Sequence, residues 1–335
     1  MIVIVGGFDQ EEMIPTLIEG FDNAVYQPSR GVIAEHAARD NKFADKEIMS
    51  FPHENKLRFK TEAEFCEHVR AMASEAELLL WWYPKDDRPA DLVESLSCPT
   101  VYFTWDDPMS LMWGRDDARG FSHAVTSCLD SLDYYAKRGI AAMHTLPPIS
   151  PSLHGLVKPI REEACDIAMT FYALYDGQAS WLNEQIKRRH LIELAGEQAK
   201  YRTHVYGGWG RSDFTTPKRS SYRGFRGAEE MPSVFASAKI SVTQHPQVQA
   251  RGYVSPRDTV ALASGSFLLS DRTVGLVNNF DFDMYYSTPG EYVAQLRRWL
   301  VDEDGRKQIA YEARTFLFNN HTGSKFAERL LEFVL

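Results

Sequence analysis

The fold is decided by residues 255–271, SPRDTVALASGSFLLSD. They predict a polar loop, a short helix of small residues, a stop at Gly265 and a buried strand that ends in Asp271. The first turn of a helix leaves backbone N–H groups unpaired and carries the positive end of the helix dipole. Arg257 adds a fork of donors that fits a phosphate. We therefore expect a substrate with a phosphate or diphosphate at this junction.

Short apolar runs alternate with helical patterns along the chain, which indicates βαβ units and parallel sheets. The expected strands of the first half are Met1–Val5, Glu77–Tyr83, Thr100–Trp105, His123–Thr126 and Ala142–Leu146. Its expected helices are Glu62–Ser74, Leu129–Arg138 and one around Gly31–Asp40 that precedes a weak strand. The second half predicts strands at Asp166–Tyr172, Arg202–Tyr206, Ile240–Thr243 and Phe267–Leu269. Its expected helices are Trp181–Gln198, Pro289–Asp302, Gly305–Asn319 and Gly323–Leu335.

A proline-rich segment divides these two series. Pro147, Pro148 and Pro151 exclude regular helix and a central strand, so they predict a linker. We expect a first domain at residues 1–150, a second at 151–320, and a C-terminal helix at 321–335. Two α/β halves joined in this way predict a cleft lined by the carboxyl ends of strands, where such domains bind ligands.

Composition excludes several classes of protein. With 37 basic and 46 acidic residues the net charge is −9, which argues against a protein that binds polyanions over its whole surface. No apolar run is long enough to span a bilayer, and the N-terminus predicts a first strand instead of a signal peptide. Four scattered cysteines predict neither a zinc site nor a disulfide framework, and a cytoplasmic location is the simplest expectation.

Two motifs of the first half follow expected strands. Gly6, Gly7 and Phe8 follow the first strand, where the glycines allow close approach of a ligand or make a tight turn. They do not form a dinucleotide-binding fingerprint. Asp106 and Asp107 follow a later strand, where they could supply a general base, bind sugar hydroxyls, or cap the next helix through Asp107.

Three motifs of the second half are candidates for ligand contacts, and the first two follow expected strands. The glycine-rich segment that begins at Gly207 and Gly208 and ends at Arg211 predicts close approach of a ligand or a loop with positive φ angles. Gln244 and His245 follow another strand, where a histidine can donate to a phosphate or a sugar hydroxyl. The basic run 217–226 fits either a surface loop or contacts with nucleic acid.

The second half resembles the CgeB-like glycosyltransferases of the spore-maturation-protein type, from about Asp166 to the C-terminus. The similarity is carried by residues 222–224 and 231–240, by Pro256-Arg257 through Asp271, and by 275–276, 284–287, Glu291, 309–310 and 321–322. In the first half, residues 106–108 and 146–148 resemble the acceptor-domain pattern of the same group.

This resemblance implies the GT-B fold: two Rossmann-like domains that face a central cleft, with a final helix crossing back to the first domain. It implies a hexosyl- or pentosyltransferase that moves a sugar from a nucleotide diphosphate sugar to an unidentified acceptor, without a bound metal or a tightly bound cofactor. The predicted donor-binding residues are Gly207, Gly208, Arg211, Gln244, Ser255, Pro256, Arg257, Asp258, Thr259 and Gly265. The predicted catalytic residues are Asp107, Asp106 and His245, and Gly6, Gly7 and Phe8 are expected on the acceptor side.

One position departs from the family pattern. Val260 stands where these enzymes usually have a glutamate that binds the nucleotide ribose, and valine cannot accept that hydrogen bond. Either a neighbour such as Asp258 substitutes, or the donor binds differently, or the protein is a non-catalytic nucleotide- or sugar-binding protein. A further alternative, based on the basic run, is a glycosyltransferase that modifies a base in DNA. The candidate acceptors are a glycan, a protein, a small molecule or a modified DNA base.

Overall fold

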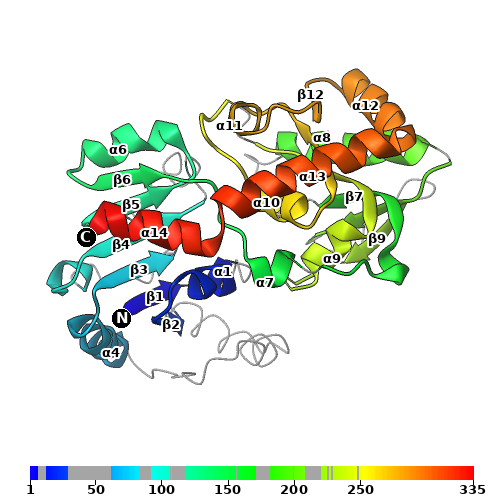
Figure 1. Ribbon diagram of the computed structural model, residues 1–335. Coiled ribbons are helices and arrows are strands. Elements are labelled where there is room, and N and C mark those ends of the chain that lie inside the picture. Colours follow the sequence, from blue (N-terminus) through cyan, green and yellow to red (C-terminus); the bar gives the residue numbers. More distant parts are fainter. Residues whose placement is uncertain are drawn as a thin grey trace. The chain divides into compact units, whose positions relative to one another are not determined.

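The computed structural model describes residues 1–6, 13–28, 62–82, 92–105, 107, 118–155, 157–170, 182–198, 200–207, 220–224, 226–227, 229–246 and 249–335. The chain divides into two compact units (Figure 1). Unit 1 comprises Met1–Thr145 and Gly323–Leu335, and unit 2 comprises Leu146–Thr322.

Unit 1 is built on a parallel six-stranded sheet with the strand order β2-β1-β3-β4-β5-β6. Its strands are β1 (Ile2–Gly6), β2 (Ala24–Pro28), β3 (Leu78–Trp82), β4 (Thr100–Thr104), β5 (His123–Thr126) and β6 (Ala141–His144). Its helices are α1 (Met13–Gly20), α4 (Glu62–Ser74), α6 (Leu132–Ala136) and α14 (Gly323–Val334), with short 3-10 turns at Val93–Ser95 and Leu129–Ser131.

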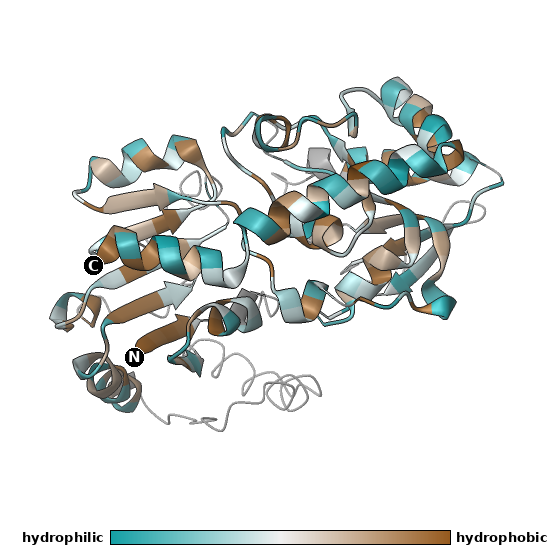
Figure 2. Ribbon diagram, viewed as in Figure 1, coloured by the Kyte–Doolittle hydropathy of each residue, from teal (hydrophilic) through white to brown (hydrophobic). Residues whose placement is uncertain are grey.

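The apolar strands of unit 1 contribute side chains to two hydrophobic cores, one on each face of the sheet. Ile2 and Ile4 of β1 belong to the core that includes residues of α1 and α14, whereas Val3 and Val5 belong to the core that includes α4 and α6. Alternate side chains of a strand point to opposite faces, so a strand covered on both faces must be apolar throughout. The continuous apolar sequences of β1 and β3 therefore follow from their central position (Figure 2).

The C-terminal helix α14 packs on α1 at a glycine contact. A Cβ atom added to Gly20 would lie 2.3 Å from the carbonyl oxygen of Gly323, and one added to Gly323 would lie 2.2 Å from the carbonyl oxygen of Thr16. The ring of Phe326 then stacks on Phe103 of β4, with ring centroids 5.1 Å apart. The last helix of the chain is therefore part of the core of unit 1, as the predicted return to the first domain requires.

Unit 2 contains a second parallel sheet, with the order β12-β11-β10-β7-β8-β9. Its strands are β7 (Cys165–Thr170), β8 (Thr203–Tyr206), β9 (Ser220–Gly224), β10 (Ala238–Thr243), β11 (Phe267–Asp271) and β12 (Tyr285–Tyr286). Its helices are α7 (Pro151–His154), α8 (Leu182–Glu197), α9 (Met231–Ala236), α10 (Pro256–Ala263), α11 (Val274–Asn279), α12 (Pro289–Val301) and α13 (Glu303–Asn320), with a 3-10 turn at Arg161–Glu163.

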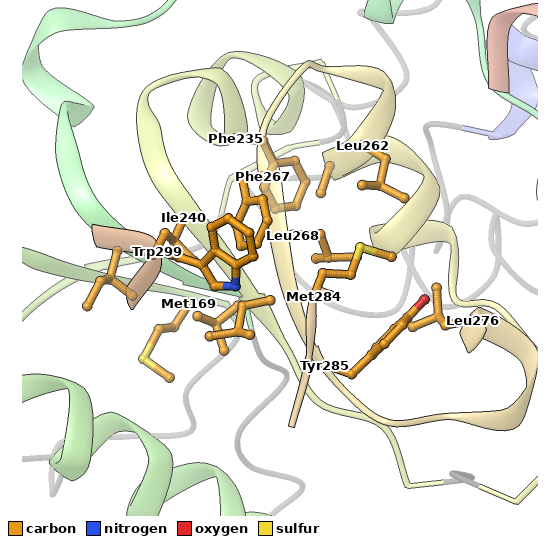
Figure 3. Close-up of a cluster of buried hydrophobic side chains, with 14 of the residues drawn as sticks. Met169, Phe235, Ile240, Leu262, Phe267, Leu268, Leu276, Met284, Tyr285 and Trp299 are labelled. Carbon is orange, nitrogen blue, oxygen red and sulfur yellow. The ribbon is translucent and has the colours of Figure 1, made fainter. Parts of the chain in front are cut away.

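The direction of chain progression reverses beside β7. From β7 the chain moves outward to β8 and β9, and it then returns to add β10, β11 and β12 on the other side. Open parallel sheets bind ligands at such a switch point, at the edge formed by the carboxyl ends of the strands. We call this the carboxyl edge of unit 2. Behind it lies a large hydrophobic core, part of which is drawn in Figure 3.

Most of the expected elements are confirmed, but three strands were missed. β2, β9 and β12 were not predicted, because each is short, polar or lies at the border of its sheet. The Ser220–Gly224 part of the basic run is strand β9, so its interpretation as a surface loop is wrong. The helix expected around Gly31–Asp40 lies outside the described residues.

Replacement of Gly20 by alanine should destabilise unit 1, because the new methyl group would overlap the backbone of Gly323. Overpacking of this kind costs about 1–3 kcal/mol. The measurement is the apparent melting temperature of Gly20→Ala beside that of Gly290→Ala. A Cβ at Gly290 meets nothing closer than Oγ1 of Thr288 at 3.9 Å, so the melting temperature of this control should equal that of the wild type. Equal melting temperatures would contradict the close contact of α1 with α14.

Candidate functional site

The carboxyl edge of unit 2 carries a buried group of charged side chains centred on His245. This residue follows β10, Asp271 ends β11, and Asp258 lies in the first turn of α10. Nδ1 of His245 lies 2.6 Å from Oδ1 of Asp271, and Nε2 lies 2.8 Å from Oδ2 of Asp258. The second contact is at ion-pair distance but lacks hydrogen-bond angles. The imidazole is 1% exposed, so it is enclosed between the two carboxylates.

The two carboxylates set the charge of this histidine. Burial by itself lowers the pKa of His245, but the negative charges of Asp258 and Asp271 outweigh burial and raise the pKa to about 10. The ring is therefore an imidazolium at neutral pH. Its contribution to stability is fully present below the ordinary histidine pKa near 6.5, and it is lost as the pH rises through about 10.

Asp258 also joins the start of α10 to β10. Its Oδ2 accepts the backbone N–H of Ser255 at 3.2 Å, and its Oδ1 accepts the hydroxyl of Thr243 at 2.8 Å. The backbone N–H of His245 in turn donates to Oδ2 of Asp271 at 3.0 Å. Polar side chains therefore connect the ends of two strands with the first turn of one helix.

The first turn of α10 offers fewer backbone donors than the sequence suggested. Pro256 has no N–H, and the N–H of Ser255 is used by Asp258. The N–H groups of Asp258 and Thr259 both point to the carbonyl of Ser255, at 3.0 and 3.4 Å. The predicted set of amides over Ser255–Thr259 therefore reduces to that of Arg257, for which the described residues provide no partner.

Arg257 is the cation at this helix start. Its side chain is half-buried, and Nη1 donates to the carbonyl oxygen of Thr170 at the end of β7, at 3.1 Å. This bond crosses the switch point between β7 and β10. Oγ1 of Thr170 is buried and has no hydrogen-bond partner among the residues that the structure describes. A guanidinium held in this way presents its remaining N–H donors beside an unsatisfied hydroxyl, which suits an anionic ligand.

Two other predicted donor residues have internal contacts. Gln244 is buried; its Oε1 accepts from Nε of Arg188 at 2.8 Å, and its Nε2 donates to the carbonyl of His245 at 2.7 Å. Gly207 follows β8 with φ at 135°, and its carbonyl accepts the hydroxyl of Tyr222 at 2.7 Å. Gln244 therefore lies inside the network, whereas the positive φ accounts for a glycine at position 207.

Two residues of this motif, Gly265 and Thr259, have contacts that do not suit ligand binding. Gly265 follows the C-terminus of α10, at the opposite end from Arg257, and its φ of 79° explains the glycine. The hydroxyl of Thr259 is buried and donates to the carbonyl of Pro256 at 3.0 Å. We therefore centre the candidate site on Arg257 and leave Gly265 and Thr259 outside it.

Val260 belongs to the hydrophobic core of unit 2. It is 3% exposed and lies on α10 among the apolar residues that pack behind the sheet edge. The neighbour suggested as its substitute, Asp258, is fully buried by the contacts described above. Neither side chain is placed to bind a ribose hydroxyl, so a ribose would have to be held by other residues.

The basic run is in part neutralised by a residue that the sequence did not indicate. Glu163 is buried and pairs with Nε of Arg223 at 2.9 Å and with Nη2 of Arg226 at 2.6 Å. Burial raises the pKa of Glu163, but bonds from Arg223, Arg226 and Tyr206 outweigh it and lower the pKa to about 2. Both arginines are therefore paired with a carboxylate of unit 2, which weakens the interpretation of the run as a nucleic-acid surface.

In unit 1, Asp107 follows β4 and is fully buried. Its Oδ2 accepts the hydroxyl of Thr126 at 2.8 Å and that of Tyr135 at 2.6 Å. Burial and the charge of Asp107 raise the pKa of Tyr135, which keeps this phenol a donor. Gly6 ends β1, and its carbonyl accepts the hydroxyl of Tyr26 at 3.2 Å. Asp107 thus has the contacts of a residue that organises the end of β4.

The other predicted site residues, Asp106, Gly7, Phe8, Gly208 and Arg211, lie outside the described residues. Across the described ranges, no group of three or more His, Cys, Asp or Glu side chains could hold a metal ion. None of the helices described is long and apolar enough to cross a membrane. The residues that the sequence reasoning missed are Asp271, Thr170, Arg188 and Glu163.

Comparison with protein families gives one match. Residues 185–332 match the family described as Glycosyl transferase-like. The match covers under half of the chain, from α8 to α14, and includes the whole of α10 and the three residues of the His245 group. No curated protein matches the sequence.

Solved structures resemble the whole chain in fold. An α-glucosyltransferase in complex with UDP-glucose and DNA containing an abasic site is 11% identical, with a TM-score of 0.62 and coverage of 100% of this chain and 99% of the other. The T4 phage BGT in complex with UDP-glucose is 10% identical, with a TM-score of 0.59 and 99% coverage of both chains. A glycosyltransferase from Rickettsia africae is 9% identical, with a TM-score of 0.59 and coverage of 99% and 97%. The predicted GT-B fold, with two Rossmann-like units and a C-terminal helix on α1, is confirmed.

Proposed function

We propose that this protein is a glycosyltransferase that transfers a sugar from a nucleotide diphosphate sugar, with the donor bound by unit 2 and the acceptor by unit 1. The family match over residues 185–332 and the fold of the solved glucosyltransferases support this reaction class. Two of those structures are complexes with UDP-glucose, so a UDP-sugar is the first donor to test. Membership of the CgeB-like group stays a prediction.

The observation that carries the proposal is the position of Arg257. It lies at the start of α10, beside the switch point of a parallel sheet, and is fixed by its bond to the carbonyl of Thr170. A leaving nucleoside diphosphate gains negative charge as the sugar departs, and a guanidinium at a helix N-terminus stabilises that charge. We propose that this arrangement replaces a bound metal.

On the acceptor side we propose that one carboxylate of the pair Asp106 and Asp107 assists deprotonation of the acceptor. Asp107 is buried and already accepts two hydroxyl hydrogen bonds. Its contacts favour a role in holding the end of β4, and this assigns contact with the acceptor to Asp106.

A base in DNA is a second candidate acceptor. Its support is that a solved structure with this fold, matched over its whole length, is a glucosyltransferase in complex with DNA. The pairing of Arg223 and Arg226 with Glu163 counts against the part of the basic run that is described. Binding of duplex DNA that weakens steeply with salt would favour this acceptor, and no binding at low salt would exclude it.

Replacement of Arg257 by alanine should weaken binding of UDP about tenfold to a hundredfold, because a charged hydrogen bond contributes about 1.5–3 kcal/mol. Isothermal titration calorimetry with UDP measures this loss. Arg297→Ala is the control, since Arg297 is an exposed arginine of α12 that pairs with Gln198, and it should bind UDP as the wild type does.

Unchanged binding of UDP by Arg257→Ala would remove the assignment of the site. Wild-type binding without turnover across a panel of donors and acceptors would instead favour the non-catalytic nucleotide-binding alternative. Turnover that persists in excess chelator is expected for a metal-independent enzyme, and turnover that stops would contradict that part of the proposal.

Replacement of Asp106 and replacement of Asp107 should have different effects on turnover and on melting temperature. Asp106→Asn should lower the turnover number at least tenfold with little change in melting temperature, because its role is in the chemical step. Asp107→Asn should lower the melting temperature, because it disturbs the buried bonds with Thr126 and Tyr135. Donor turnover and thermal unfolding measured on both variants test this division. The reverse pattern would assign the acceptor base to Asp107.

A further inference from the structure

The His245 group joins three elements of unit 2. His245 follows β10, Asp271 ends β11 and Asp258 lies in the first turn of α10. Asp271 accepts both the ring and the backbone N–H of His245, while Asp258 accepts the N–H of Ser255 immediately before α10. The start of α10 is therefore joined to the imidazolium through Asp258, which the hydroxyl of Thr243 on β10 also holds.

The charge balance of this group depends on His245. One cation lies between two buried carboxylates, and removal of the cation leaves them facing each other. Other titratable or charged groups beside this network are Arg188 of α8, which bonds to Gln244, and the phenols of Tyr253, Tyr285 and Tyr286. Arg188 contacts the side chain of Gln244 at 2.8 Å.

The loop that leads into α10 is fixed from its other side by close packing. A Cβ atom added to Gly275 would lie 1.9 Å from the carbonyl oxygen of Tyr253, so the backbone of this loop rests directly on α11. The ring of Tyr253 meets that of His245 edge-to-face, with centroids 6.3 Å apart. The loop is therefore held between α11 and His245, and it has little freedom to absorb a change in the charged group.

We propose that His245 is a positioning residue that, acting through Asp258, fixes the first turn of α10 and thereby places Arg257 for an anionic donor. This inference rests on the proposed donor site, and it assigns His245 to the support of Arg257 instead of to contact with the sugar. Asp271 joins the functional residues as the anchor of the imidazolium on β11.

The test compares the UDP affinity of folded variants. His245→Gln should weaken UDP binding at least tenfold at pH 7.5, and Asp271→Asn should weaken it by a smaller factor. The matched control is Asp166→Asn, which removes a carboxylate from the amino end of β7 that accepts the N–H of Arg202 and pairs with Lys239. The control should bind UDP within twofold of the wild type. Each titration is made at a temperature at which the variant is fully folded by circular dichroism.

A purely structural role for His245 would lower the melting temperature of His245→Gln and leave the dissociation constant of the folded protein unchanged. That result, with normal binding by the wild type, would overturn this inference and leave the proposed function standing. If His245→Gln does not fold, Asp271→Asn decides by the same criterion. A wild type that binds no nucleoside diphosphate would overturn the proposed function and, with it, the placement of Arg257 for a donor.

The pH dependence supplies a second readout that stability alone would not give. The ratio of the dissociation constants of His245→Gln and wild type should stay constant from pH 7 to pH 9 and shrink as the pH rises through about 10, where the imidazolium loses its proton. Because both proteins bind the same ligand at the same pH, the effect of phosphate titration on the two dissociation constants cancels in their ratio. A ratio that changes between pH 6 and pH 8 would instead indicate a histidine of ordinary pKa in contact with the ligand, and it would contradict a positioning role.

Discussion

The charged contact between His245, Asp258 and Asp271 is the constraint on which the carboxyl edge of unit 2 depends. Hydrophobic packing brings β10, β11 and α10 together, but it does not fix where the polar ends of these elements lie. A buried cation between two carboxylates does so, because removal of one member of a buried pair costs about 3–5 kcal/mol. The network thereby sets the start of α10 and the place of Arg257 beside Thr170.

The polar residues of this edge have two different roles, although the sequence predicts ligand binding for all of them. Gln244, His245 and Asp258 are buried and bonded to each other or to backbone. Arg257 and Gly207 lie at the partly exposed surface of the same edge. In the proposed donor site, the buried residues fix the shape of this edge, and rigid support of this kind allows a few exposed groups to be positioned accurately.

The sequence predicted the large features of the fold because each has a local cause. Strands covered on both faces, such as β1 and β3, are apolar throughout, and Pro147 and Pro148 interrupt any helix between the two series. Strand β9 was missed because its residues have no apolar pattern. The ion pair of Arg223 with Glu163 could not be predicted either, because the two residues lie 60 positions apart in the sequence. The sequence held a signal for the pairing of His245 with Asp271, since His245 follows β10 and Asp271 ends β11, and these consecutive strands are parallel neighbours.

A crystal structure of the protein with UDP would locate the diphosphate. We expect its density within hydrogen-bond distance of the guanidinium and backbone N–H of Arg257, with His245 still enclosed by Asp258 and Asp271. A diphosphate bound elsewhere on unit 2, or an imidazole of His245 turned out to contact the ligand, would contradict this expectation.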